Sequence, residues 1–234
     1  MNAPEVVLNL LAWGAVFILA RRIYTKQESK PIIWKLVIVI LVGLFSFSIN
    51  LPYMDQQIKL AILPLGVWIL YGIYSRKNEG ISWDQYRKYA WLGFFANFIF
   101  LAVSLINPLI HCAIFPGNEI STYLSNSNKG KIIQTHPSAD HKKLDRDSLL
   151  IQMDSIKEEP VFSEKWYYET FESGIERSKA EERFPYQLAR TKAKWGSGID
   201  PMIFVEQDGK GLLISTGQKQ LYFRAEKTFL KKGE

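Results

Sequence analysis

The chain of 234 residues has a single cysteine, Cys112, and no N-x-[ST] acceptor for N-linked glycosylation. One cysteine excludes a disulfide within the chain. Any part of the protein outside the cytoplasm must therefore be stable through its core alone, and about 118 residues of C-terminal chain suffice for that. Both absences favour a bacterial cell membrane over a eukaryotic secretory setting.

Acidic residues are missing from the interiors of the apolar stretches in the first half, where Glu5 stands only at one edge. Ion-coupled transporters usually need such groups near the membrane midplane. The stretch from Tyr89 to Asn118 has no charged residue at all. The remaining chain has a mixed, charged composition, so the sequence divides into an apolar half and a half of soluble character.

The apolar stretches are apolar all round rather than on one face, which indicates lipid and not a soluble core. Aromatic residues near their ends match a membrane-interface belt. We therefore expect a transmembrane domain over residues 1–116, although the first stretch is short and an interfacial helix there is an alternative. The four predicted transmembrane helices cover about 5–20, 32–52, 58–74 and 90–110.

The basic residues of this half are grouped, with nine of the ten in the first and third connections or at the start of the second span. Cytoplasmic loops are enriched in Lys and Arg, so both chain ends are expected outside. The excess lies between apolar segments, which excludes nucleic acid as its partner and indicates the lipid bilayer instead. The nine residues are Arg21, Arg22, Lys26, Lys30, Lys35, Arg76, Lys77, Arg87 and Lys88.

The second half predicts a linker over 117–143 and an extracytoplasmic α+β domain over 144–234. Helices are expected after Asp147 or Ser148, over 175–183 and from Pro185 towards Trp195. A helix is also expected over 164–173, where an aromatic strand is the alternative. Three short β-rich runs end the chain, separated by Asp208-Gly209 and Gly217. They predict a three-stranded antiparallel meander. The fold class is thus a membrane all-α domain of four helices followed by a soluble α+β domain.

No nucleophile, P-loop, zinc-protease or thiol motif occurs. His136, Asp140 and His141, with Asp145 and Asp147, offer zinc-ligand chemistry, but their spacing matches no zinc signature and the segment has loop composition. His111 and Cys112 form a packed or headgroup-level pair. We therefore predict no catalytic, cofactor-binding or metal residue and no cofactor, and lean towards a protein that is not an enzyme.

The basic-aromatic stretch 183–195, RFPYQLARTKAKW, allows two interpretations. It is either a helix packed on the sheet with a basic outer face, or a surface for anionic lipid headgroups. The first is the simpler expectation.

The functional hypothesis is a multi-pass protein of the cell membrane that presents an extracytoplasmic binding module, in an accessory, immunity or sensor role. The partner of that module would be a protein or a cell-envelope component. The alternative is a small transport component in which Pro64, Gly66 and Asn97 line a path in an oligomer. A third possibility is a membrane-bound hydrolase that uses the segment His136–Asp147.

Overall fold

The computed structural model describes residues 2–54, 56–75, 83–171 and 181–233, which belong to two compact units. One unit is Pro4–Ile110, and the other combines Met1–Ala3 with His111–Glu234. The first is called here the helical unit and the second the sheet unit. Arg76 and Lys77 of the predicted third connection lie outside the described residues, and so does most of the helix predicted over 175–183.

Two helices are long and apolar enough to cross a membrane, by length and composition: α1 (Ala3–Lys26) and α4 (Trp83–Ile114). At 1.5 Å per residue they reach about 36 and 48 Å, beyond a hydrocarbon core of about 30 Å. Leu10, Phe17 and Ile18 on α1 are each about two-thirds exposed. Apolar exposure of this extent suits a lipid environment better than water.

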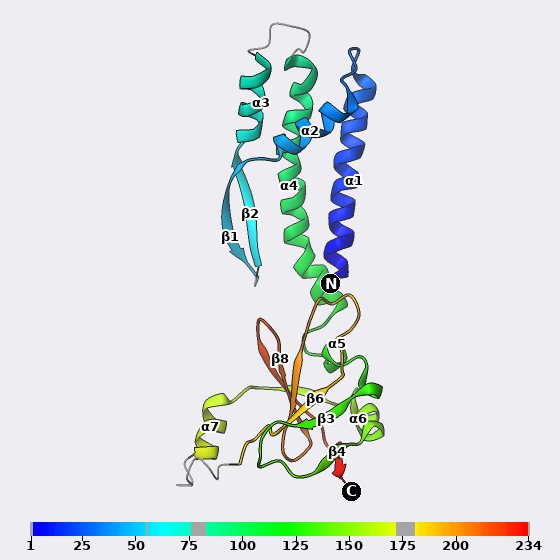
Figure 1. Ribbon diagram of the computed structural model, residues 1–234, viewed down its shortest axis with the longest axis vertical. Coiled ribbons are helices and arrows are strands. Elements are labelled where there is room, and N and C mark those ends of the chain that lie inside the picture. The colour runs from blue at the N-terminus through cyan, green and yellow to red at the C-terminus, as the bar shows by residue number, and fades with distance from the viewer. Residues whose placement is uncertain (1, 55, 76–82, 172–180, 234) are drawn as a thin grey trace. The chain divides into compact units, whose positions relative to one another are not determined.

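The two long helices run antiparallel in the helical unit (Figure 1). The side chain of Gln27, just after α1, donates to the carbonyl of Gln85 in the first turn of α4 at 3.0 Å. The hydroxyl of Tyr89 donates back to Gln27 at 3.0 Å. Midway along, the rings of Trp13 and Phe100 meet edge to face at 5.2 Å. The end of α1 therefore lies beside the beginning of α4.

The prediction of four transmembrane helices is wrong, because among the described residues only α1 and α4 are long enough to cross. The second and third predicted spans each divide into a short helix and a strand. Helices α2 (Ile33–Gly43) and α3 (Leu65–Ser75) have 11 residues each, or about 16 Å. Strands β1 (Phe47–Tyr53) and β2 (Gln56–Leu63) form an antiparallel hairpin between them.

The residues explain this division. From Phe45 to Leu51 apolar and polar side chains alternate with a period of two, which is a strand pattern and not a helical one. Pro64 then lies directly before α3, where its missing N–H costs no helical hydrogen bond. Apolar residues continue through the hairpin, so composition alone did not reveal that the pattern changes from a helical period to a strand period of two.

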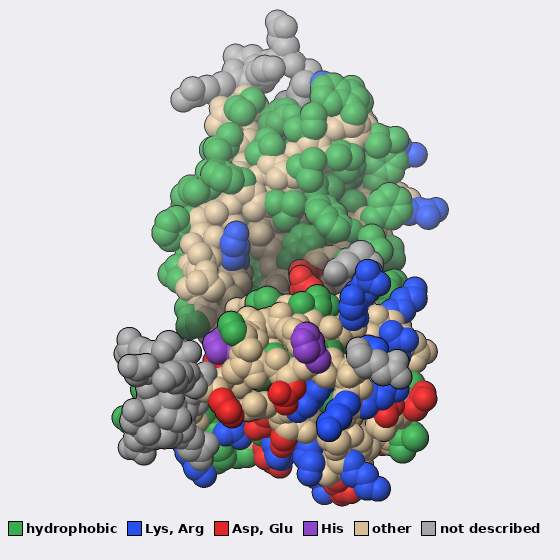
Figure 2. Space-filling view, turned by 60° about the horizontal axis from the view of Figure 1, so that its bottom comes forward, with side chains coloured by type: hydrophobic (Ala, Val, Ile, Leu, Met, Phe, Trp, Pro, Cys, Tyr) green, Lys and Arg blue, Asp and Glu red, His purple; other side chains and the backbone are tan. Residues whose placement is uncertain are grey.

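Helices α2 and α4 pack with their backbones in close contact at two glycines. Gly43 and Gly93 face each other so closely that a Cβ on either would collide with the partner helix backbone, at Ala90 and Ile40 respectively. Val39, Tyr89 and Ala90 are fully buried around this crossing. Figure 2 shows apolar side chains over much of the face of the helical unit that it presents.

The sheet unit contains a six-stranded antiparallel sheet in the order β3-β6-β7-β8-β9-β5. The meander lies at the predicted positions, but it forms the middle of this larger sheet. A separate pair joins β4 (Lys142–Leu144) to β10 (Leu230–Lys232). The six strands are β3 (Lys131–Gln134), β5 (Lys157–Glu159), β6 (Tyr186–Ala189), β7 (Met202–Val205), β8 (Gly211–Ser215) and β9 (Gln220–Arg224).

Short helices complete this unit: α5 (Ile120–Tyr123), the 3-10 turn η1 (Ser127–Lys129), α6 (Arg146–Gln152) and α7 (Ser163–Phe171). The core joins α5 and α6 to the sheet through Tyr123, Leu149, Tyr186, Ile214 and Phe223. The expected linker 117–143 thus contains α5, η1, β3 and part of β4. The predicted helix from Pro185 is wrong: Tyr186 and Leu188 are buried on alternate positions, and β6 occupies the segment.

Candidate functional site

A buried carboxylate organises one edge of the sheet unit. Glu206 follows β7 and is only 6% exposed. Its Oε1 pairs with Nη2 of Arg183 at 2.7 Å, and its Oε2 pairs with Nη1 of Arg224 at 2.5 Å. The hydroxyl of Tyr222 donates to the same Oε2 at 2.6 Å. Asp208 holds the other side of Arg224 at 2.6 Å. These five residues are called here the Glu206 cluster.

Gly211 creates the space that this cluster needs. It lies opposite Arg224 in the pairing of β8 with β9, and its carbonyl accepts from the N–H of Glu206 at 2.9 Å. A Cβ at this position would collide with Oε2 of Glu206 and with the Tyr222 hydroxyl. Because glycine leaves that volume open, the carboxylate can reach across β8 to two side chains of β9.

Burial shapes the chemistry of the cluster. Burial, followed by the hydrogen bond to Glu206, raises the pKa of Tyr222 to about 12, so the phenol stays protonated. Burial alone would lower the pKa of Arg224, but its bond with Tyr222 and the carboxylates of Asp208 and Glu206 raise it instead. The Arg224 guanidinium therefore remains charged, and the Tyr222 phenol remains a donor, across the whole physiological range.

Trp166 on α7 joins the cluster to an aromatic wall. Its ring lies 5.1 Å from Tyr222 and 5.4 Å from Phe184, both edge to face. The guanidinium of Arg183 lies over the Trp166 ring at 4.8 Å, within cation–π range. Arg183 is thus held between a carboxylate and an indole.

A pocket of about 180 Å³ opens beside this wall. It is smaller than the roughly 300–1,000 Å³ of common ligand sites, so it accommodates one group of a ligand and not a whole large molecule. Among the described residues, its surface combines three cationic side chains and three aromatic ones with a single acid. The lining residues are Glu159, Pro160, Phe162, Lys165, Trp166, Arg183, Tyr222 and Arg224.

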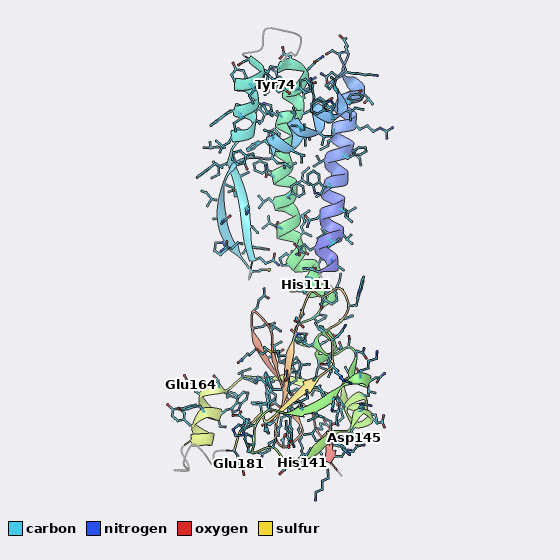
Figure 3. All side chains as sticks on the ribbon, in the orientation of Figure 1. Tyr74, His111, His141, Asp145, Glu164 and Glu181 are labelled. Atoms are coloured by element: carbon cyan, nitrogen blue, oxygen red, sulfur yellow. The ribbon has the colours of Figure 1, made fainter. Side chains whose placement is uncertain are left out.

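The residues with zinc-ligand chemistry do not converge. His136 bonds Ser138 at 2.8 Å, and His141 bonds Gln134 at 3.2 Å. Asp145 caps α6, and the backbone N–H of Ser148 lowers its pKa. Figure 3 shows His111 at the end of α4, away from His141 and Asp145. Across the described ranges, no three His, Cys, Asp or Glu residues are grouped to hold a metal ion.

The residues of the transport alternative have structural partners. The side-chain amide of Asn97 donates to the carbonyls of Leu44 at 3.1 Å and Phe94 at 3.0 Å, which satisfies the end of α2. Pro64 precedes α3, and Gly66 packs against the carbonyl of Val42. Apart from these residues, the Nε2–H of His111 donates to the Ser197 carbonyl at 2.8 Å, and Cys112 is exposed.

Sequence reasoning missed the Glu206 cluster. The available signal was an acidic residue directly after an apolar strand, in the turn Glu206-Gln-Asp208-Gly209. The register that brings Tyr222 and Arg224 beside it comes from long-range pairing. Arg183 was grouped with the basic residues of 183–195, whereas strand β6 separates it from them.

Comparison with known proteins adds no assignment: no family model, curated protein or solved structure matches this chain.

Proposed function

We propose that this chain is a membrane protein that presents its sheet unit outside the cytoplasm as a binding module. The pocket beside α7 is proposed as the place where the ligand binds. The observation that supports it is the Glu206 cluster: a buried carboxylate that fixes two guanidinium groups and a phenol against one wall of an open pocket. Fixed donors lose little conformational entropy on binding.

The orientation rests on the described basic residues. Gln27 and Gln85 are hydrogen-bonded, so the end of α1 and the beginning of α4 share one side of the helical unit. Arg21, Arg22 and Lys26 lie on that side with Arg87 and Lys88. The positive-inside rule assigns this side to the cytoplasm. The opposite ends, from which the sheet unit continues, are then extracytoplasmic.

The chemistry of the pocket favours an anionic group carried on an apolar or aromatic body. Lys165, Arg183 and Arg224 supply positive charge, and Trp166 and Phe162 supply apolar surface. Glu159 is the only acid among the described residues of the lining, and it disfavours a purely anionic ligand of high charge. Carboxylate and phosphate both match guanidinium donors. A peptide or a cell-envelope polymer could carry either group.

Small probes test this assignment on the full chain in lipid nanodiscs. Benzoate and phenyl phosphate carry the proposed anion on a ring, while benzamide keeps the ring and lacks the charge. We expect calorimetry to detect the two anions and to find benzamide much weaker. Lys165→Gln should weaken anion binding roughly tenfold or more, since a charge-assisted hydrogen bond is worth about 1.5–3 kcal/mol.

Lys157→Gln is the matched control, because Lys157 is also an exposed lysine of this unit but does not line the pocket. It should bind both probes as the parent chain does. Equal affinity for benzamide, or equal loss in the two lysine variants, would overturn the pocket assignment.

No contact of Asn97, Pro64 or Gly66 favours the transport alternative, which stays a sequence-based hypothesis.

A further inference from the structure

The loop from Arg190 to Gly198, called here the Trp195 loop, exposes a large aromatic side chain. Trp195 is 82% exposed, a value matched among the described large apolar residues only by Ile151. Tryptophan usually buries most of its surface. Its loop also carries Arg190, Lys192 and Lys194, all exposed, and no acidic residue.

Backbone hydrogen bonds hold this loop in place. The N–H of Lys194 donates to the Thr122 carbonyl at 2.9 Å, and the N–H of Ser125 donates to the Lys192 carbonyl at 3.0 Å. Within the loop, the Ser197 N–H donates to Lys194 at 3.1 Å. The exposure of Trp195 is therefore a property of an ordered turn, not of a chain without contacts.

The same loop forms hydrogen bonds with the first residue of α1 and with the last turns of α4. Both of these residues, Ala3 and His111, belong to the sheet unit. The N–H of Ala3, where α1 begins, donates to the Gly196 carbonyl at 2.8 Å. His111, in the last turns of α4, bonds the Ser197 carbonyl at 2.8 Å. Gly196 has a φ of +82°, and a Cβ there would crowd Ala3. Glycine thus permits this close approach.

These contacts fix the level of Trp195 if α1 and α4 cross a bilayer. Ala3 and Ile114 end the two helices, so residues bonded at those ends lie near the headgroups. Tryptophan is enriched at this level, because its ring prefers the boundary between water and hydrocarbon. Lysine and arginine beside it attract anionic lipids. At this level the exposed ring of Trp195 would contact lipid instead of water.

We propose that the Trp195 loop is a lipid-contact surface: Trp195 inserts at the outer interface of the same bilayer, and Arg190, Lys192 and Lys194 engage anionic phospholipid headgroups. The inference shares with the proposed function only the premise that α1 and α4 cross the membrane, and it does not involve the pocket ligand. A protein partner on the loop is the competing outcome.

An environment-sensitive label tests it on the full chain. Cys112→Ser supplies a background without cysteine, and Trp195→Cys then carries a nitrobenzoxadiazole label in nanodiscs. We expect a blue-shifted emission that lipid-borne quenchers reduce, and a larger shift when a third of the phosphatidylcholine is replaced by phosphatidylglycerol. Combining Lys192→Gln with Lys194→Gln should remove the dependence on phosphatidylglycerol.

Two label positions separate the outcomes. Ile151→Cys, equally exposed on α6, should report water in both lipids. Phe17→Cys on α1, 68% exposed, should report hydrocarbon. Water at 195 with hydrocarbon at 17 overturns the lipid-contact surface and leaves the membrane crossing intact. Water at both positions overturns the shared premise as well. A blue shift at 195 that lipid-borne quenchers do not reduce indicates a protein contact and also overturns the proposal.

Discussion

A carboxylate taken out of water loses several kcal/mol of solvation unless charged and hydrogen-bonding partners offset it. Glu206 meets this condition with two guanidinium groups and one phenol on its two oxygens. Such clusters bring little net stability compared with apolar packing, but loss of one member is costly. The arrangement therefore serves the geometry of the pocket more than the stability of the core.

The first test at the scale of single residues concerns the space that Gly211 leaves open. Gly211→Ala places a methyl group against Glu206 and Tyr222, and we expect a loss of roughly 1–3 kcal/mol of unfolding free energy, the usual cost of overpacking. Thermal unfolding followed by near-UV circular dichroism would measure it. Gly217→Ala is the control, because a Cβ there meets nothing within 4 Å. Equal stability of the two variants would contradict the role given to Gly211.

The second test at residue scale is alkaline pH. The folded-state pKa of Tyr222, about 12, exceeds the ordinary value of 10, so the neutral phenol is favoured on folding. Its contribution is complete below pH 10 and is lost as pH rises towards 12. Since a tenfold change in an ionisation constant is worth about 1.4 kcal/mol, the loss is roughly 2–3 kcal/mol.

Tyr222→Phe has no proton to lose, so its stability should fall less than that of the parent chain between pH 10 and 12. Burial also raises the pKa of Tyr123 and Tyr186, but these residues titrate equally in both proteins. The difference between the two pH profiles therefore isolates Tyr222. Parallel profiles would show that this phenol ionises as it does in water.

Among the elements, the crossing of α2 and α4 depends on two glycines. Gly93→Ala would push a methyl group into the backbone of α2 at Ile40 and Gly43. We expect a lower melting temperature in detergent, since overpacking outweighs the gain of about 1 kcal/mol in helix propensity. Gly72→Ala in α3 meets nothing within 4 Å and should keep or raise it. A stabilised Gly93→Ala would refute the close crossing.

Elements with local signals were predictable, and those set by pairing were not. Asp208-Gly209 and Gly217 placed the turns of β7, β8 and β9 correctly, because turn chemistry is local. The hairpin of β1 and β2 was not predicted, because a run of 19 uncharged residues after Lys35 favoured a transmembrane helix over the period-two pattern. Strand β6 was missed because Pro185 suits the first position of a helix, which was therefore predicted from there towards Trp195. The Glu206 cluster could not be predicted without knowing the register between β7, β8 and β9.

For the whole molecule, reducing four spans to two leaves the orientation argument unchanged. If both α1 and α4 cross, the start of α1 and the end of α4 lie on one side, and the basic residues lie on the other. Helices α2 and α3, with 11 residues each, are too short to add a crossing by themselves. Arg76 and Lys77, outside the described residues, extend the same basic connection in sequence.

The sidedness can be measured with single cysteines in the Cys112→Ser background. Gln218→Cys lies in the exposed turn between β8 and β9, and Glu28→Cys lies exposed just beyond the basic end of α1. A membrane-impermeant maleimide added to intact cells should label position 218 at once and position 28 only after lysis. This follows from the proposed orientation, in which the two residues lie on opposite sides of the bilayer. Labelling of position 28 alone would invert the molecule, and equal labelling before lysis would mean that α1 does not separate two compartments.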